Sequence, residues 1–472
     1  MPLILGTNSI KDTGYDVANS LRFNIGSTDY LNRTSGTSSN TNVWSLSMWI
    51  KRSDVSSSGS QKVFSAGSGS TDRTEIYFGT DDKLNIFRNI SGSEINIVTS
   101  MVFRDPSSWY HTLWVWNGTA ITLYVNGASV TLSATNLGTN KINGSSTVHR
   151  IGIQHDNSSQ NFGGYLAEVT FLDGTAVSDA TSFGEFDSDS PNIWKPKNVS
   201  GLTFGNNGFY LDFEDSSALG NDAAGSNNFT VNNLTAVDQS TDTCTNNFAT
   251  LNPLATSSFN DLSEGSLKIT GNTATNDGET FSTFVMPNAT AKWYWELKCT
   301  NKYSGGNPKF GFIQAKRGFR LQNGGAGYGG AASGTLDIMV RPDGKTLENG
   351  STSGSAVIGT WDTGDILSFA LDSVNGAFYV GINGTWQTSG NPESGASKTG
   401  AVKTWTPTDS KCDDGQAVCI GSYNGSVTEA NFGSPSFAIS SGNTDADGHG
   451  NMEFSVPSGY FVLNSKNLAE YG

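Results

Sequence analysis

The chain has 472 residues, a length that suggests about two to four domains. It contains 56 Gly but only 28 Lys and Arg, and aromatic residues make up 11%. This composition supplies large apolar side chains for cores and few residues for surface helices, so it predicts an all-β protein. The formal net charge of −15 argues against a nucleic-acid partner, because phosphate binding needs clustered Lys and Arg.

The first residues show neither a secretion signal nor a membrane anchor. Residues 1–16 lack a basic start and a sustained apolar run. No stretch reaches the roughly 20 apolar residues that span a bilayer, so we expect no membrane insertion. Residues 1–20 are polar and aperiodic, which is typical of an arm that becomes ordered only against a partner. We therefore predict an N-terminal docking arm.

Alternating apolar and polar residues predict a first β-sandwich over residues 21–213. Residues 44–50 alternate as a half-buried strand does. The segments 109–116 and 121–125 flank Asn117-Gly118. Two strands around Asn-Gly are the strongest local signal of a β-hairpin, because both turn positions favour φ > 0.

A polar stretch without a clear period, residues 214–262, follows the first sandwich, and we expect it to form an irregular linker. Beyond it, the alternating segments 365–371 and 377–382 flank the turn Asn375-Gly376. This arrangement repeats the hairpin of the first part. The sequence therefore predicts a second sandwich over residues 263–472, with a tail at its C-terminal end.

The four cysteines are sparse for a disulfide scaffold. Cys412 and Cys419 flank Asp414-Gly415. A four-residue loop at 414–417 would place the two thiols opposite each other, whereas a two-residue turn would not. A disulfide and two separate thiols are both compatible with this spacing.

Short motifs in the two halves are similar to two kinds of β-sandwich. Those of the first half are residues 20–23 (SLRF), 29–30 (DY), 44–50 (WSLSMWI), 109–127 and 164–168 (GYLAE). They resemble the laminin-G and concanavalin A-like lectin/glucanase superfamily. Those of the second half are residues 292–296 (KWYWE), 328–329 (YG), 343–345 (DGK), 364–365 (GD), 371–372 (LD), 375–376 (NG), 384–386 (GTW) and 431–433 (NFG). They resemble a SPRY domain. The resemblance implies an all-β fold of two tandem concanavalin A-like jelly rolls.

A third set of motifs lies between and after the predicted sandwiches. They are residues 183–187 (FGEFD), 194–196 (WKP), 207–213 (NGFYLDF), 219–222 (LGND), 228–230 (NFT), 245–253 (TNNFATLNP), 456–461 (VPSGYF) and 467–470 (NLAE). This combination is similar to virion and tail-fibre-like proteins of tailed phages. The resemblance implies a structural protein on the exterior of the phage particle, with other virion proteins as partners. It also implies a homo-oligomer, with a trimer favoured.

Two sets of residues are candidates for ligand binding. Trp386 and Trp405 lie next to turns, where an exposed ring offers a platform for a sugar, while most other aromatic residues alternate and are expected in the cores. Asn443, Asp445 and Asp447 place oxygen-bearing side chains at alternate positions before a glycine, which resembles a calcium loop. A surface turn is the alternative for the second set. No cofactor is required.

Three alternating carboxylates are considered as a catalytic site. Glu185, Asp187 and Asp189 alternate, which on a strand would place three carboxylates on one face. Retaining glycosidases need two carboxyl groups about 5–5.5 Å apart. The flanks are not apolar strand and the trio ends in Asp, so we predict no enzyme.

The predicted function is a tail fibre or adhesin whose loops bind host-surface glycan or protein. The alternatives are a capsid decoration protein without a host ligand and a surface-polysaccharide depolymerase.

Overall fold

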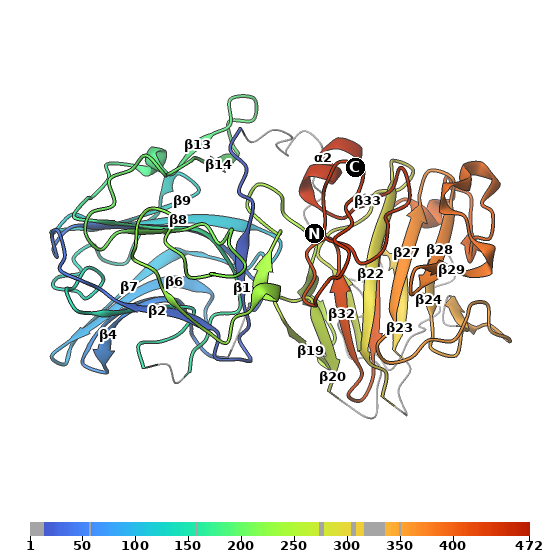
Figure 1. Ribbon diagram of the computed structural model, residues 1–472, viewed down its shortest axis with the longest axis horizontal. Helices are drawn as coiled ribbons and strands as arrows, with labels where there is room; N and C mark the ends of the chain where they lie inside the picture. Colours follow the sequence, from blue (N-terminus) through green and yellow to red (C-terminus); the bar gives the residue numbers. More distant parts are fainter. Residues whose placement is uncertain are drawn as a thin grey trace. The chain divides into compact units, whose positions relative to one another are not determined.

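The structure, a computed structural model, describes residues 14–55, 58–156, 159–272, 278–303, 308–315, 336–348 and 351–472. The chain divides into two compact units, one formed by Asp12–Asn247 and the other containing Phe248–Gly472 (Figure 1). In each unit two sheets of mostly antiparallel strands enclose an apolar core. The predicted all-β class with two jelly-roll sandwiches is therefore confirmed.

The first unit is a sandwich of two large sheets and a small hairpin. One sheet contains, in spatial order, β10 (Ala128–Ser129), β9 (Ile121–Val125), β8 (Trp109–Trp116), β3 (Trp44–Arg52), β12 (Gly164–Asp173), β1 (Ser20–Phe23) and β17 (Gln239–Ser240), with β15 (Phe209–Leu211) beside β12. The other contains β16 (Thr230–Asn232), β2 (Tyr30–Thr34), β11 (Val148–Ile151), β4 (Gln61–Gly69), β5 (Asp72–Phe78), β6 (Lys83–Ile90) and β7 (Ser93–Val102). The hairpin is β13 (Gly184–Phe186) with β14 (Trp194–Pro196), and the short 3-10 helices are η1 (Ala180–Ser182) and η2 (Ala236–Asp238).

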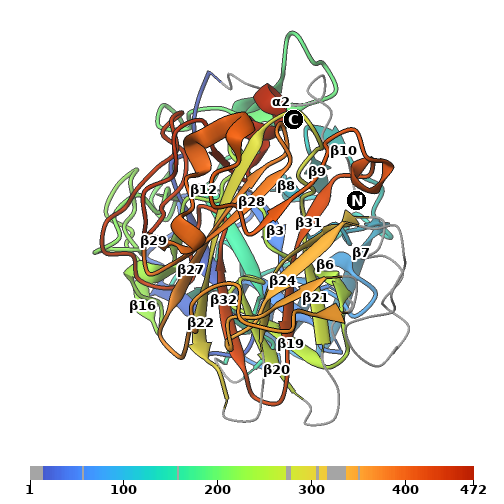
Figure 2. The same cartoon turned by 90° about the vertical axis from the view of Figure 1, so that its right-hand side faces the viewer.

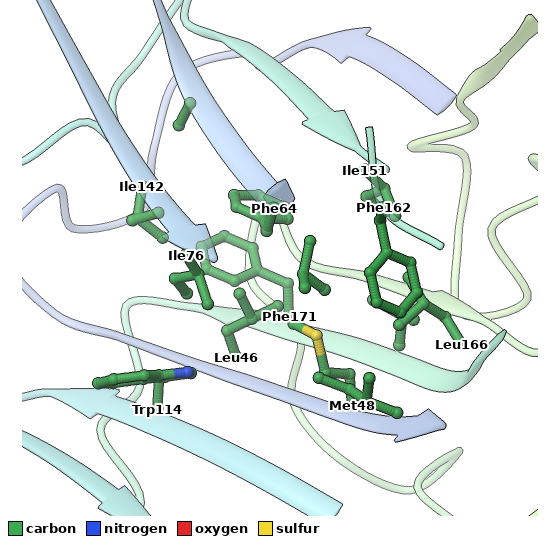
Figure 3. Packing of buried hydrophobic residues seen from close by; sticks show 14 of the residues in the cluster. Leu46, Met48, Phe64, Ile76, Trp114, Ile142, Ile151, Phe162, Leu166 and Phe171 are labelled. Carbon is green, nitrogen blue, oxygen red and sulfur yellow. The ribbon is translucent and has the colours of Figure 1, made fainter. Parts of the chain in front are cut away.

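Strand β3 lies inside the first sandwich and is buried on both faces. Its residues Leu46 and Met48 enter the core between the sheets, where they meet Phe171 of β12 (Figure 3). The outer face was predicted to be solvated, yet all nine residues of the strand are buried. Trp49 on that face lies in a second apolar cluster with Trp194 of β14. The side chains of β3 do alternate between the two faces of the sheet, but a later part of the chain covers the outer face.

The predicted linker at residues 214–262 is not a separate connection. Its first part belongs to the first unit, where β16 pairs with β2 and β17 pairs with β1. Its last part belongs to the second unit, where β18 (Leu251–Thr256) and β19 (Asn260–Ser263) join the two sheets. Several of these strands are only two or three residues long, so they are too short to show a period in the sequence.

Residues 1–13 of the predicted docking arm lie outside the described residues. Residues 14–19, the rest of that segment before β1, pack on the first unit. Val17 is buried, and its N–H donates to Thr245 Oγ1 at 3.0 Å. The hydroxyl of Tyr15 lies 3.2 Å from Glu168 Oε2. This part of the segment is therefore integrated in the sandwich.

The second unit has the same kind of architecture (Figure 2). One sheet contains β18, β21 (Gly278–Ser282), β31 (Gln416–Ser422), β23 (Lys309–Gln314), β24 (Asp337–Val340), β25 (Thr346–Glu348) and β26 (Ser351–Thr352). The other contains β19, β20 (Lys268–Gly271), β32 (Val427–Asn431), β22 (Lys292–Asn301), β27 (Ile366–Asp372), β28 (Ala377–Ile382) and β29 (Thr385–Trp386), with β30 (Lys403–Thr404) beside β28 and β33 (Phe461–Val462) beside β22. The helices that the described residues of this unit form are η3 (Gln387–Ser389), η4 (Pro392–Ser397), η5 (Ser410–Cys412) and α2 (Ser465–Tyr471). Across the described ranges, none of the helices has the length and apolar character needed to cross a bilayer.

Both predicted hairpins form, β8 with β9 and β27 with β28. The tightest turns lie elsewhere. Asn126-Gly127 and Asn383-Gly384 have φ > 0 at both positions, as a two-residue hairpin turn requires. At Asn117-Gly118 and Asn375-Gly376 only the glycine has a positive φ. The connections at these two places are longer, so the asparagine keeps an ordinary conformation.

Candidate functional site

A cavity of about 230 Å³ lies in the second unit. Its wall comes from three separate segments, namely the start of β24, strand β30 with the residues after it, and η5. The lining residues are Leu336, Asp337, Lys403, Thr404, Trp405, Thr406, Asp409, Lys411 and Cys412. Trp405, one of the two tryptophans predicted as sugar platforms, is therefore part of a cavity wall. We take this cavity as the candidate site.

The turn at Asn375-Gly376 positions Trp405. The backbone N–H of Trp405 donates to Gly376 O at 3.0 Å. Gly376 has φ +76°, and a Cβ atom there would lie 2.3 Å from Trp405 O. Only glycine permits this close approach of the two backbone segments. On its other side the indole ring packs against Phe312, with centroids 5.9 Å apart. A hairpin turn distant in sequence therefore fixes the aromatic part of the wall.

The charged groups of the cavity are paired with neighbours. The Lys403 ammonium forms an ion pair with Glu348 of β25. The Lys411 ammonium lies 3.8 Å from Asp409 Oδ2. Asp409 also caps η5, because its Oδ1 accepts from the N–H of Lys411 at 3.0 Å. The cavity therefore presents polar groups of both signs rather than an excess of positive charge.

Cys412 and Cys419 are thiols that are not joined by a disulfide. Cys412 ends η5, and its carbonyl accepts from the N–H of Gly415 in a turn. Cys419 is carried into β31, where it pairs with Gly311. Burial raises the pKa of the Cys412 thiol to about 11. This thiol in the cavity wall is therefore neutral at physiological pH and is not an activated nucleophile.

Trp386, the other predicted platform, lies outside the cavity wall. It belongs to β29, where it pairs with Gly381 of β28. Its ring is partly buried against a cluster on the outer face of the second unit that includes Tyr379 and Met452. The structure therefore separates the two tryptophans: one lines a cavity, and the other packs on a sheet.

The predicted calcium loop is a hydrogen-bonded turn. Both carboxylate oxygens of Asp445 accept hydrogen bonds. The donors are the backbone N–H groups of Asp447, His449 and Val462 and the side-chain amide of Asn467, at 2.8–3.1 Å. Asn443 likewise donates its amide to the carbonyl of Glu453 at 3.0 Å. Donors thus occupy the positions that a cation would need. In the part of the chain that the structure describes, no group of three or more His, Cys, Asp and Glu side chains could hold a metal ion.

The carboxylate trio has local structural roles. Glu185 is 44% exposed on β13 and forms an ion pair with Lys197 at 3.2 Å. Asp187 Oδ1 accepts from the N–H groups of Asp189 and Ser190 and so closes the turn that leads to β14. The hydrogen bond from Ser190 holds the pKa of the Asp187 carboxyl below its usual range. Glu185 and Asp187 therefore take part in contacts that hold the hairpin of β13 and β14 together.

Sequence analysis missed two buried glutamates. Glu168 has φ +53° at a bulge in β12 and is 5% exposed. Its carboxylate accepts from the hydroxyls of Tyr210 at 2.8 Å and Tyr15 at 3.2 Å. Burial raises its pKa to about 7. The sequence signal that could have indicated this buried residue is a glutamate inside an apolar strand, as in the motif GYLAE.

Glu296 lies in β22 of the second unit and is fully buried. Its carboxylate accepts from the Tyr294 hydroxyl at 2.8 Å and from the N–H groups of Glu453 and Phe454 at 2.9 and 2.8 Å. Burial raises the pKa of Glu296 above its usual range. Both glutamates attach a covering segment to the outer face of a sheet.

Comparisons with known proteins bear on the first unit most directly. No curated protein matches the sequence of this chain. Among solved structures, the chain is similar to a native heptameric SAP-like pentraxin from Limulus polyphemus, with 18% identity and a TM-score of 0.28 over 35% of this chain and 80% of that one. It is similar to the SPRY domain of human HERC1, with 11% identity and a TM-score of 0.27 over 38% of this chain and 96% of that one.

A third similar structure is domain 4 of AbnA, a GH43 extracellular arabinanase from Geobacillus stearothermophilus, in complex with arabinotriose. The identity is 16% and the TM-score 0.25, over 29% of this chain and 63% of that one. Residues 25–181 match the family model of the concanavalin A-like lectin/glucanases superfamily. This match lies within the first unit and supports a concanavalin A-like domain of the laminin-G type there.

Proposed function

We propose that the protein is a non-enzymatic carbohydrate-binding protein and that the cavity beside Trp405 is its ligand site. The position of Trp405 carries this proposal, because its indole ring belongs to a wall in which hydroxyl, amine and carboxyl groups outnumber the apolar Leu336 and the thiol of Cys412. A saccharide presents hydroxyls around an apolar ring face. An aromatic side chain and a few convergent polar groups complement both features. The lectin-type domain of the first unit also favours binding.

The rigidity of the site further supports binding. The Trp405 backbone is held by Gly376 O and by the Lys398 ammonium, which donates to Trp405 O at 3.0 Å. A preformed wall lowers the entropic cost of association. Cys412 is a neutral thiol, and Asp409 is engaged as a helix cap, so the chemistry of the wall suits recognition better than bond cleavage.

We further propose that this binding serves host attachment by a tailed phage. The third set of motifs in the sequence, which resembles that of phage virion and tail-fibre-like proteins, supports this part. The protein would then lie on the exterior of the particle as a tail fibre or adhesin. Its partners would be other virion proteins, copies of itself (a trimer favoured) and a host-surface glycan.

A glycan array with the full chain tests the proposed binding. We expect binding to a subset of glycans without release of new reducing ends. Trp405→Ala should weaken binding by at least about tenfold, as truncation of an aromatic anchor does. Trp386→Ala is the matched control and should bind as the parent protein does. A blank array would instead favour a decoration protein, and new reducing ends would favour a depolymerase. Antibody labelling of the particle tests the location.

A further inference from the structure

We infer that the cavity beside Trp405 accepts one neutral sugar ring at the end of a glycan, rather than an internal part of a chain or an acidic sugar. This inference rests on the proposed carbohydrate-binding function and specifies its ligand. The size of the cavity, the closure of its floor and the pairing of its charges each limit what can enter.

The volume limits the ligand to a single ring. Pockets that take drug-sized ligands measure roughly 300–1,000 Å³. The cavity beside Trp405 measures about 230 Å³ and is smaller than that range. Two linked sugar rings have the bulk of a drug-sized ligand, so the second ring has to remain outside. One ring fits with the indole along one side.

The arrangement of the lining favours entry end-on. Of the lining residues, Leu336, Asp337 and Cys412 are buried, and we infer that they form the floor. Thr404 and Thr406 are exposed, and we infer that they form the mouth. An internal sugar of a chain needs two openings, one for each neighbouring unit. A buried floor with an exposed mouth offers one opening, which suits the terminal ring of a glycan.

The charges of the cavity favour a neutral ring. The Lys403 ammonium is paired with Glu348, and the Lys411 ammonium has Asp409 as its neighbour. Asp337 adds a further carboxyl to the floor. An acidic sugar brings a carboxylate or sulfate that needs unpaired cationic donors. Here both ammonium groups of the lining already have a carboxylate neighbour, and the carboxyl groups of Asp337 and Asp409 would oppose a further negative charge.

Competition experiments with the full chain test the inference. A glycan that the protein binds on an array is immobilised, and neutral monosaccharides, uronic acids and free oligosaccharides are added as competitors. We expect the neutral monosaccharide that matches the terminal ring to compete and the uronic acids to fail. Removal of the terminal ring from the immobilised glycan should abolish binding.

Three variants make the result specific to the cavity. Trp405→Ala should lose at least about tenfold in affinity, with Trp386→Ala as control. Because Trp405 also packs on Phe312, Thr406→Trp provides a second variant that fills the mouth from an exposed position and should block binding. Glu348→Gln frees the Lys403 ammonium and should allow a uronic acid to compete.

The outcomes separate the inference from the function on which it rests. If no glycan binds, the proposed function is wrong. If a glycan binds but its terminal monosaccharide does not compete, or if uronic acids compete with the parent protein, the function stands and the end-on neutral ring is wrong. Unchanged binding in both Thr406→Trp and Trp405→Ala would place the site elsewhere. Binding of a peptide at the cavity in place of sugars would also overturn the inference.

Discussion

The two sandwiches differ in where they keep their charges. In the first, Lys51 pairs with Asp242 and Arg52 pairs with Asp82, and each of these side chains is 1% exposed or less. In the second, pairs such as Lys403–Glu348 keep both side chains about one third exposed. Buried pairs hold covering segments on the first unit, whereas the paired charges near the surface of the second unit line a cavity. The same type of fold thus carries fully buried ion pairs in one unit and paired charges beside the candidate site in the other.

The largest expected loss of stability follows from breaking a buried ion pair of the first unit. Lys51→Met leaves the buried carboxylate of Asp242 without its ammonium partner, and loss of one member of such a pair costs about 3–5 kcal/mol. Peptide-resolved hydrogen exchange should show lower protection in β3 and unchanged protection in β22. Lys302→Met, which removes an exposed partner of Asp362 in the second unit, is the control and should have a much smaller effect. Equal losses in the two variants would contradict the comparison.

Acid should weaken the first unit through His149. Burial lowers the pKa of His149 to about 3, and its ring packs between Phe64 and Phe171. Since the folded pKa lies below the unfolded value, the stabilisation is complete above about pH 6.5 and is lost as the pH falls. Between pH 7 and pH 4 the loss should reach about 3 kcal/mol. His149→Phe should reduce this pH dependence in denaturant titrations. His449→Gln in the second unit should not, and a similar reduction there would refute the assignment.

Glu168 should give the opposite pH dependence. Burial raises its pKa to about 7. A raised folded pKa gives a stabilisation that is present below the unfolded value and is lost as the pH rises through about 7. Between pH 5 and pH 8 we expect the first unit to lose about 2.5 kcal/mol. Glu168→Gln should flatten the unfolding free energy over this range, whereas the exposed control Glu185→Gln should keep the slope. An unchanged slope in Glu168→Gln would show that the carboxyl is ionised throughout.

The smallest expected effect compares two hairpin glycines. Each glycine has a positive φ and lies close to a tryptophan. A Cβ atom added at Gly127 would lie 2.3 Å from the Trp194 ring, and one added at Gly376 would lie 2.3 Å from Trp405 O. Each Gly→Ala variant should lose about 1–3 kcal/mol in denaturant titrations, because the residue is strained and the neighbour has to move. Only Gly376→Ala should also weaken glycan binding. Loss of glycan binding in Gly127→Ala would place the ligand in the first unit.

Local patterns were sufficient for the strands and the fold class. The alternation in residues 44–50 and the segments around Asn375-Gly376 predicted β3, β27 and β28, because side chains on successive residues of a strand point to opposite faces. Trp405, predicted as an exposed platform, is partly buried against the core of the second unit. The alternation could not show that the outer face of β3 is covered, since the covering residue Trp194 lies far along the chain.

The sequence by itself determined the all-β class, the two sandwiches and their main hairpins, since these depend on the polarity of neighbouring residues. Only the tertiary structure decided which carboxylates have hydrogen-bond partners from distant segments. Asp445 follows a calcium-like spacing, yet distant donors such as Asn467 satisfy its oxygens. The cavity beside Trp405 likewise brings together segments from β24, β30 and η5. Hydrogen-bond partners and enclosed space depend on how distant segments pack, and spacing along the chain does not encode this.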